Sequence, residues 1–320
     1  MTSPWIHPTR RAFLTSAAGV AVAGLPGLSA RQAMPTRAIP ATGERIPVIG
    51  AGTSKVVDEI GQHGTEPLAA VLRTLVAQGG RLVDAPSAAR APQGAPQPWL
   101  HNGDNEAAFG RVISDPALKS LFVTLKIDQN GKAEGQKQFE DTQRRFNRRP
   151  VDLTQIFNLI DIGNHWPSAR GWKDAGLTRY VGVTVGTAAL YDVLEKFLAR
   201  EKPDFVQINY SITERDSEAR LLPMLADRGI AVIINRPFMN GSYFKRLADR
   251  PLPSWASEFG CSSWAQFSLK YILANPAPTC ILTETSNPRH MTENAQAGYG
   301  PVPTEAHRQQ MRAFIDGLRG

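Results

Sequence analysis

The chain is poor in cysteine, in long apolar runs and in excess charge. Two cysteines in 320 residues are too few for a disulfide framework, and neither Cys261 nor Cys280 has the spacing of a metal ligand. A net charge of +7 without a block of lysine and arginine does not call for a nucleic-acid partner. We therefore expect no metal site and no nucleic-acid binding. The thiols are expected to be small buried residues, although a pair could form in an oxidising compartment.

The first 30 residues form a segment of their own. Arg10 and Arg11 precede an apolar run from Ala17 to Leu25, and small residues follow up to Ala30. This order is typical of a twin-arginine export signal, and the run is shorter than the roughly 20 apolar residues of a membrane span. The sequence predicts export to the periplasm, no membrane attachment once residues 1–30 are removed, and a leader over 31–43. A disordered basic N-terminus is the alternative.

Over residues 44–320, apolar runs bounded by turn residues alternate with segments of helical periodicity. Eight strands are expected, at Ile46–Gly50, Leu82–Asp84, Leu121–Lys126, Leu153–Asp161, Tyr180–Thr184, Phe205–Asn209, Ile230–Asn235 and Thr279–Thr283. The alternation favours parallel pairing through right-handed crossovers and predicts an α/β fold, a (β/α)8 TIM barrel. A doubly wound open sheet is the alternative, but the G-x-G-x-x-G turn of dinucleotide-binding sheets is missing.

In such a barrel the chemistry lies at the carboxyl ends of the strands. The residues at these ends are Asp84, Lys126, Phe157, Thr184, Gln207, Asn235 and Thr285. Asp84 and Lys126 put opposite charges at neighbouring strand ends. They are either part of a catalytic group or an ion pair without a catalytic role, and the sequence favours neither.

With their flanking residues, these strand ends resemble those of the aldo/keto reductases. The resemblance runs from IPVIGAGT (46–53) to about Gly298 and is most specific in KDAGLTRYVGVT (173–184), VQINYS (206–211) and TSNPRHMTEN (285–294). It extends to a branch of that family with export signals. It implies an α/β barrel that binds NADP(H) or NAD(H) without a Rossmann unit and reduces a small carbonyl compound. We expect a monomer.

The catalytic residues that the resemblance implies are a tyrosine that donates a proton, assisted by aspartate, lysine and histidine. Asp84 and Lys126 match the aspartate and the lysine by position, whereas Phe157 stands where the histidine is expected. The two possible tyrosine positions hold Ala89 and Asn102. No tyrosine occurs between residues 84 and 126, and an Ala- and Pro-rich insertion replaces the connection that would carry it.

His101, in the same insertion, is a candidate replacement for the missing phenol. A histidine pKa of about 6.5 suits proton donation, although a lone loop histidine is usually solvated. A well-placed proton donor is typically worth roughly 10²–10⁴ in rate, so we expect reduction to be weak or altered.

The resemblance also implies positions for the cofactor. Thr184 and Gln207 match residues that hold the carboxamide of the nicotinamide, Asn235 replaces an aromatic ring that often stacks on it, and Arg236 could meet the pyrophosphate. A phosphate could bind at the helix start formed by Thr285, Ser286, Asn287, Arg289, His290 and Asn294. Glu284 lies near the usual position of a phosphate-binding lysine, so recognition of NADP would depend on Arg289 and His290. A helix N-terminus capped by serine or asparagine is the alternative.

Two classes of function therefore remain open. One is an exported, NAD(P)H-dependent reductase of aldehydes or ketones. The other is a catalytically impaired barrel that serves as an exported binding or partner protein. Oxidation of NAD(P)H in the presence of a carbonyl compound would distinguish the reductase from the binding protein.

Overall fold

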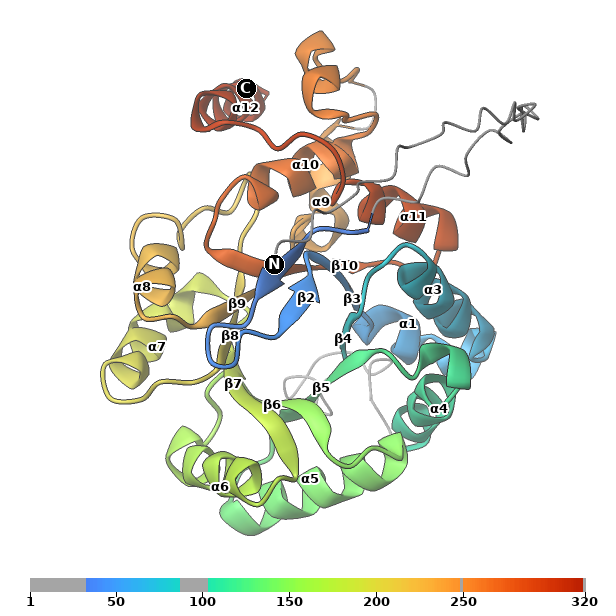
Figure 1. Ribbon diagram of the computed structural model, residues 1–320, viewed down its shortest axis with the longest axis vertical. Coiled ribbons are helices and arrows are strands. Elements are labelled where there is room, and N and C mark those ends of the chain that lie inside the picture. Colours follow the sequence, from blue (N-terminus) through green and yellow to red (C-terminus); the bar gives the residue numbers. More distant parts are fainter. Residues whose placement is uncertain (1–32, 87–102, 248–249, 319–320) are drawn as a thin grey trace, which may run out of the picture. The chain divides into compact units, whose positions relative to one another are not determined.

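The computed structural model describes residues 33–86, 103–247 and 250–318, and these described residues belong to one compact unit. Eight parallel strands close into a barrel, in the order β10-β3-β4-β5-β6-β7-β8-β9. Figure 1 shows helices surrounding this barrel. The predicted (β/α)8 barrel is confirmed. The predictions for the export signal, Ala89, His101 and Asn102 lie outside the described residues.

The barrel strands agree with the predicted ones within a few residues. They are β3 (Ile49–Gly52), β4 (Leu82–Asp84), β5 (Phe122–Ile127), β6 (Val151–Phe157), β7 (Thr178–Thr184), β8 (Phe205–Asn209), β9 (Ala231–Asn235) and β10 (Pro278–Glu284). Nearly all of their residues are buried, because the interior of the barrel covers one face and the helices cover the other.

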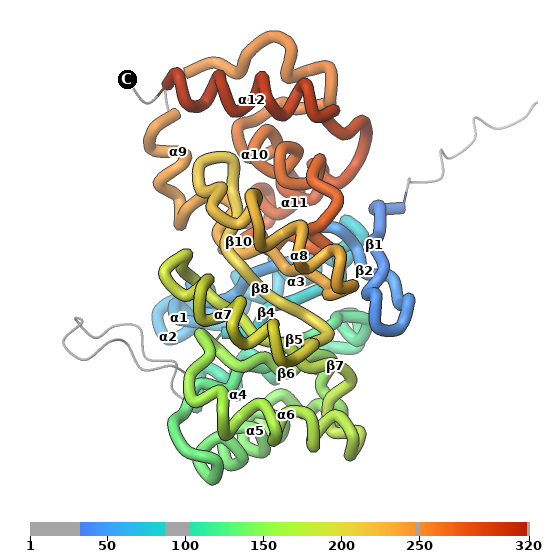
Figure 2. Tube along the Cα trace, turned by 90° about the vertical axis from the view of Figure 1, so that its left-hand side faces the viewer, coloured from blue at the N-terminus to red at the C-terminus, as the bar shows by residue number. Residues whose placement is uncertain are grey.

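The helices form the outer layer, with two short ones after β3. They are α1 (Ser54–Asp58), α2 (Ile60–His63), α3 (Glu66–Ala77), α4 (Gly103–Ile113), α5 (Lys132–Phe146), α6 (Ile162–Asp174), α7 (Tyr191–Leu198), α8 (Leu221–Asp227), α9 (Ser242–Leu247), α10 (Trp264–Leu273), α11 (Pro288–Gln296) and α12 (Glu305–Gly317). Figure 2 shows α12 running beside α10. None of the helices in the described ranges is long and apolar enough to cross a membrane.

The predicted strand Ile46–Gly50 is wrong as a single element. Its first half is β2 (Arg45–Pro47), which pairs antiparallel with β1 (Thr36–Ala38), and its second half begins barrel strand β3. Ile39 and Ile46, from the hairpin, pack against Phe122 and Phe205 inside the barrel. Because the end of β2 and the start of β3 are both buried, the apolar run continues across the break and hides it. The segment expected to be a leader thus contributes β1.

The predicted end of β6 is also wrong. The strand stops at Phe157 rather than Asp161, because Asn158, Leu159 and Asp161 all have left-handed backbone angles that no strand accommodates. Helix α6 then begins at Ile162. The side chain of His165 packs inside this region, completely buried, with its Nε2 2.6 Å from the carbonyl oxygen of Gln129. Cys261 and Cys280 are both free and buried, as expected.

Candidate active site

A cavity of about 770 Å³ opens at the carboxyl ends of the barrel strands. Its walls come from strands on all sides of the barrel and from the loops that follow β3 and β9. The lining includes six of the seven strand-end residues singled out in the sequence, namely Asp84, Lys126, Phe157, Thr184, Gln207 and Asn235. Arg236 lines it as well. The alternation of strands and helices therefore locates the cavity correctly.

Asp84 and Lys126 form a buried ion pair at the base of the cavity. Lys126 Nζ lies 2.6 Å from Asp84 Oδ2 and also donates to the carbonyl oxygen of Ala85 at 2.7 Å. The hydroxyl of Thr124 donates to the other carboxylate oxygen at 2.8 Å. Both charges are thus fixed by several contacts, which a buried ion pair requires to offset its desolvation.

Two glutamine side chains extend this arrangement across the barrel. Gln207 Nε2 donates to Asp84 Oδ2 at 3.2 Å, and Gln155 Nε2 donates to Gln207 Oε1 at 3.0 Å. Both ends of the Gln207 amide therefore hydrogen-bond within the protein. Sequence reasoning missed Gln155, although a signal existed. It lies two positions before Phe157, so both side chains face the same side of β6.

The ends of β7 and β9 are connected across the cavity by polar side chains. Arg236 Nη1 donates to the carbonyl oxygen of Gly186 at 2.9 Å, and Asn235 Nδ2 lies 3.5 Å from the carbonyl oxygen of Val185. Thr184, which ends β7, is buried. The Arg236 backbone has a φ of 53°, a conformation that costs a non-glycine residue energy and often marks functional sites.

Phenylalanine rings line the cavity, and one of them, Phe157, stands where the histidine is expected. Phe157 lines the cavity together with Phe238 and Phe244, whose ring centroids are 4.9 Å apart. Of the residues that the structure describes, no histidine and no tyrosine lines the cavity. The phenyl rings therefore suit an apolar part of a ligand. Lys126 is the buried side chain that brings a proton to the cavity.

A further carboxylate, Glu284, lies at the mouth of the cavity. The backbone N–H of Lys55 donates to Glu284 Oε1 at 2.6 Å. Crowding by protein atoms raises the pKa of Glu284 above its usual value, the hydrogen bond from Lys55 opposes this, and the nearby Asp84 adds to the rise. The side chain of Glu284 is nevertheless exposed to solvent. The resemblance places this residue near the usual position of a phosphate-binding lysine.

The predicted phosphate site lies just outside this lining. Asn287 caps α11 through a hydrogen bond from the Arg289 N–H to its Oδ1 at 2.9 Å. Thr285 Oγ1 accepts from the Asn287 N–H at 3.0 Å and lies 3.5 Å from His290 Nδ1. Asn294 is buried, and Ser286 and Arg289 are exposed. None of the six predicted residues lines the cavity, and their cofactor role stays a prediction.

The described side chains do not form a group that would bind a metal ion. Within residues 33–86, 103–247 and 250–318, no three His, Cys, Asp or Glu residues are grouped as metal ligands would be. Residues 301–318 do not line the cavity.

Comparison with known proteins places the chain in a family. Residues 48–312 match the model of the aldo/keto reductase family. A search of curated proteins found no match. A solved aldo-keto reductase from Bacillus halodurans, in its holo form, superposes with a TM-score of 0.67 at 19% identity, over 89% of this chain and 96% of that one. One from Klebsiella pneumoniae, in complex with NADP and acetate, gives 0.69 at 18% identity, over 85% and 93%. The chain belongs to the aldo/keto reductase family.

Proposed function

We propose that the protein is a nicotinamide-dependent oxidoreductase that reduces an aldehyde or ketone slowly. The observation that carries the proposal is the buried Asp84–Lys126 pair, which places an ammonium group at the base of an open cavity. The solved Klebsiella relative in complex with NADP supports the class of cofactor. Export through the segment of residues 1–30 is part of the same proposal.

The described lining residues fit a bound dinucleotide. Asn235 Oδ1 and Arg236 Nε are buried without a hydrogen-bond partner, although both side chains line the cavity. Buried polar atoms without partners are costly, so two of them beside one cavity indicate a ligand with a donor and an acceptor. Thr184, Gln207, Asn235 and Arg236 would hold NADP or NAD, with the start of α11 as a further phosphate site. The bound nicotinamide supplies a hydride to the carbonyl carbon.

The protein's own contribution is to stabilise and protonate the carbonyl oxygen. Lys126 presents its ammonium group to the cavity, and Asp84 and the carbonyl of Ala85 fix its position. As hydride reaches the carbon, negative charge develops on the oxygen, and a preorganised cation nearby lowers the barrier. Without a phenol or imidazole in the described lining, the reaction should be slower by roughly 10²–10⁴. His101 stays a candidate donor from outside that lining.

Replacing Lys126 tests the proposal. We expect the purified protein to quench NADH or NADPH fluorescence and to oxidise the cofactor with a panel of aldehydes and ketones, and Lys126→Met to abolish turnover. Lys137→Met is the matched control, because that lysine lies exposed on α5 in an ion pair with Asp141. Turnover that survives Lys126→Met would contradict the proposed role of the ammonium.

A binding or partner protein is the second candidate function. The apolar Phe157 at the expected histidine position favours it, since a phenyl ring cannot hydrogen-bond a carbonyl oxygen. Cofactor binding without turnover on any carbonyl would support this function. Export is tested separately, by replacing Arg10 and Arg11 with lysine, which should retain the protein in the cytoplasm.

A further inference from the structure

The turn that follows β6 has an unusual backbone. Asn158, Leu159 and Asp161 have φ angles of 48°, 57° and 45°, in the left-handed region that favours glycine. Such angles cost a non-glycine residue energy, persist only where surrounding contacts hold them, and cluster at functional sites. The turn begins directly after Phe157, whose side chain lines the cavity. This strained backbone is therefore held in place next to the cavity wall.

Asn158 binds the end of β7 with both its backbone and its side chain. Its N–H donates to the carbonyl oxygen of Thr184 at 2.7 Å, and its Oδ1 accepts from the N–H of Gly186 at 3.0 Å. Because Phe157 is in register with Thr184, the first bond continues the β6–β7 ladder. The second bond uses a short side-chain acceptor on a left-handed residue, and asparagine combines the two more readily than most residues.

Gly186 connects Asn158 to the side chain of Arg236. Gly186 lines the cavity, and its carbonyl oxygen accepts from Arg236 Nη1 at 2.9 Å. Because glycine has the widest range of backbone conformations, the bond to Asn158 limits the directions in which this carbonyl can point. The guanidinium is planar, so fixing Nη1 also fixes the direction of Nε. Arg236 Nε is buried and has no hydrogen-bond partner among the residues that the structure describes.

From this chain of contacts we infer that Asn158 is a positioning residue for the bound dinucleotide and that it acts through Gly186 and Arg236. Asn158 does not line the cavity, so its effect on a ligand there is indirect. It fixes the carbonyl that anchors one end of the guanidinium and leaves Nε for a ligand oxygen. A side chain that is ordered before binding loses less conformational freedom on binding, which strengthens affinity. The inference rests on the proposed function, because the ligand is the cofactor of that site.

Substitution by glycine isolates the contribution of the Asn158 side chain. Glycine adopts a left-handed backbone without strain, so Asn158→Gly removes the amide and keeps the turn. We expect the Gly186 N–H to exchange with solvent faster in this variant than in the wild type, which hydrogen exchange measures without cofactor. We also expect the full-length variant to bind NADH and NADPH roughly three- to tenfold more weakly in fluorescence titrations, the range that one hydrogen bond gives.

A double-mutant cycle with Arg236 separates positioning from a general effect on folding. Asn158→Gly should weaken cofactor binding in the wild-type background but not further in Arg236→Met, because residues that act through one contact are not additive. Asn164→Ala is the matched control. Its exposed amide donates to the Asp161 carboxylate in the same turn, at 2.9 and 3.0 Å, rather than bonding Gly186. It should change neither the cofactor affinity nor the exchange of the Gly186 N–H.

Three results would overturn the inference while the proposed function stands. They are an unchanged cofactor affinity in Asn158→Gly, an unchanged exchange rate at Gly186, and losses of affinity that add in the double variant. Circular dichroism checks that every variant is folded. Folded wild-type protein that binds neither NADH nor NADPH contradicts both the inference and the proposed function.

Discussion

At the scale of single residues, Gln155 connects the interior of the barrel to the ion pair. It donates to Gln207, which donates to Asp84, while Gln155 Oε1 is buried without a partner. The family pattern gave no reason to single out this position. Such a glutamine both orients a neighbour and leaves one acceptor unsatisfied, and these two effects on stability oppose each other.

We predict that Gln155→Leu weakens cofactor binding severalfold but changes the free energy of unfolding by less than about 1.5 kcal/mol. The leucine removes the unsatisfied acceptor together with one hydrogen bond, so the two stability effects largely cancel. Gln207 loses the contact that fixes its amide, and its interaction with Asp84 becomes less well defined. Fluorescence titration and urea unfolding measure the two quantities. A loss of more than about 3 kcal/mol would mean that Gln155 is chiefly a packing residue.

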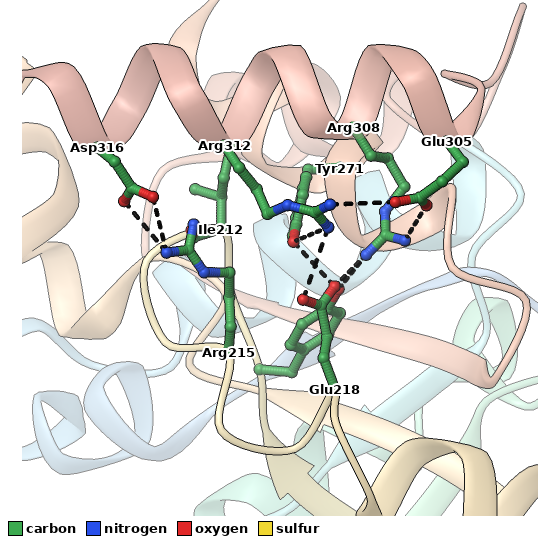
Figure 3. A network of polar contacts seen from close by, with 9 residues as sticks. Ile212, Arg215, Glu218, Tyr271, Glu305, Arg308, Arg312 and Asp316 are labelled. Carbon is green, nitrogen blue, oxygen red and sulfur yellow. Dashed lines mark hydrogen bonds and ion pairs between the residues drawn. The ribbon is translucent and has the colours of Figure 1, made fainter.

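At the scale of elements, the C-terminal helix α12 is held to the barrel by a buried polar cluster (Figure 3). The carboxylate of Glu218 accepts from Tyr271 at 2.8 Å and contacts Arg308, and Arg308 Nη2 donates to Tyr210 at 2.8 Å. Arg308 is buried, and Arg312 Nη1 lies 3.8 Å from Glu218. Nothing in the residue pattern of α12 indicates which strand-end loop it contacts.

We predict that Arg308→Met destabilises the protein by about 1.5–3 kcal/mol, because Glu218 would lose a charged hydrogen-bond partner while Tyr271 still donates to it. Urea unfolding measures the loss, and limited proteolysis should cut before α12 more readily than in the wild type. Arg215→Met is the matched control. It removes an ion pair with the more exposed Asp316, and such pairs contribute about 0–1 kcal/mol. Equal losses in both variants would contradict a special role for the cluster.

Some boundaries of the elements could not be predicted from the sequence. Strands that are buried on both faces are continuous apolar runs, so the sequence predicts that they exist. The break between β2 and β3 lies inside one such run and gives no signal. The end of β6 depends on left-handed angles at Asn158 and Leu159, and leucine gives no signal for such an angle. Contacts between strands, such as Gln155 with Gln207, depend on register, which one sequence does not reveal.

At the scale of the whole molecule, the fold and the location of the site followed from the order of the elements. Eight alternations predicted the barrel, and parallel strands put Asp84, Lys126 and Gln207 at one end. The opposite end is closed by the β1–β2 hairpin, which the sequence did not predict. Between β1 and β2, Glu44 accepts hydrogen bonds from Arg81 at 3.1 Å and from the Tyr180 hydroxyl at 2.8 Å. The hairpin thereby connects to β7 and to the residue that precedes β4.

The contribution of the β1–β2 hairpin to the stability of the protein should decrease in acid. Burial opposes ionisation of Glu44, but the hydrogen bonds from Tyr180 and Arg179 outweigh it and lower the pKa below the usual 4.5. The unfolded chain therefore takes up this proton at a higher pH than the folded protein, so the stability from Glu44 is complete above about pH 4.5 and is lost as pH falls through the lowered pKa. We predict that Glu44→Gln is less stable at pH 7 and loses less stability than the wild type between pH 5 and pH 3. Thermal unfolding across that range measures both slopes, and parallel slopes would show that the acid sensitivity of the barrel lies elsewhere.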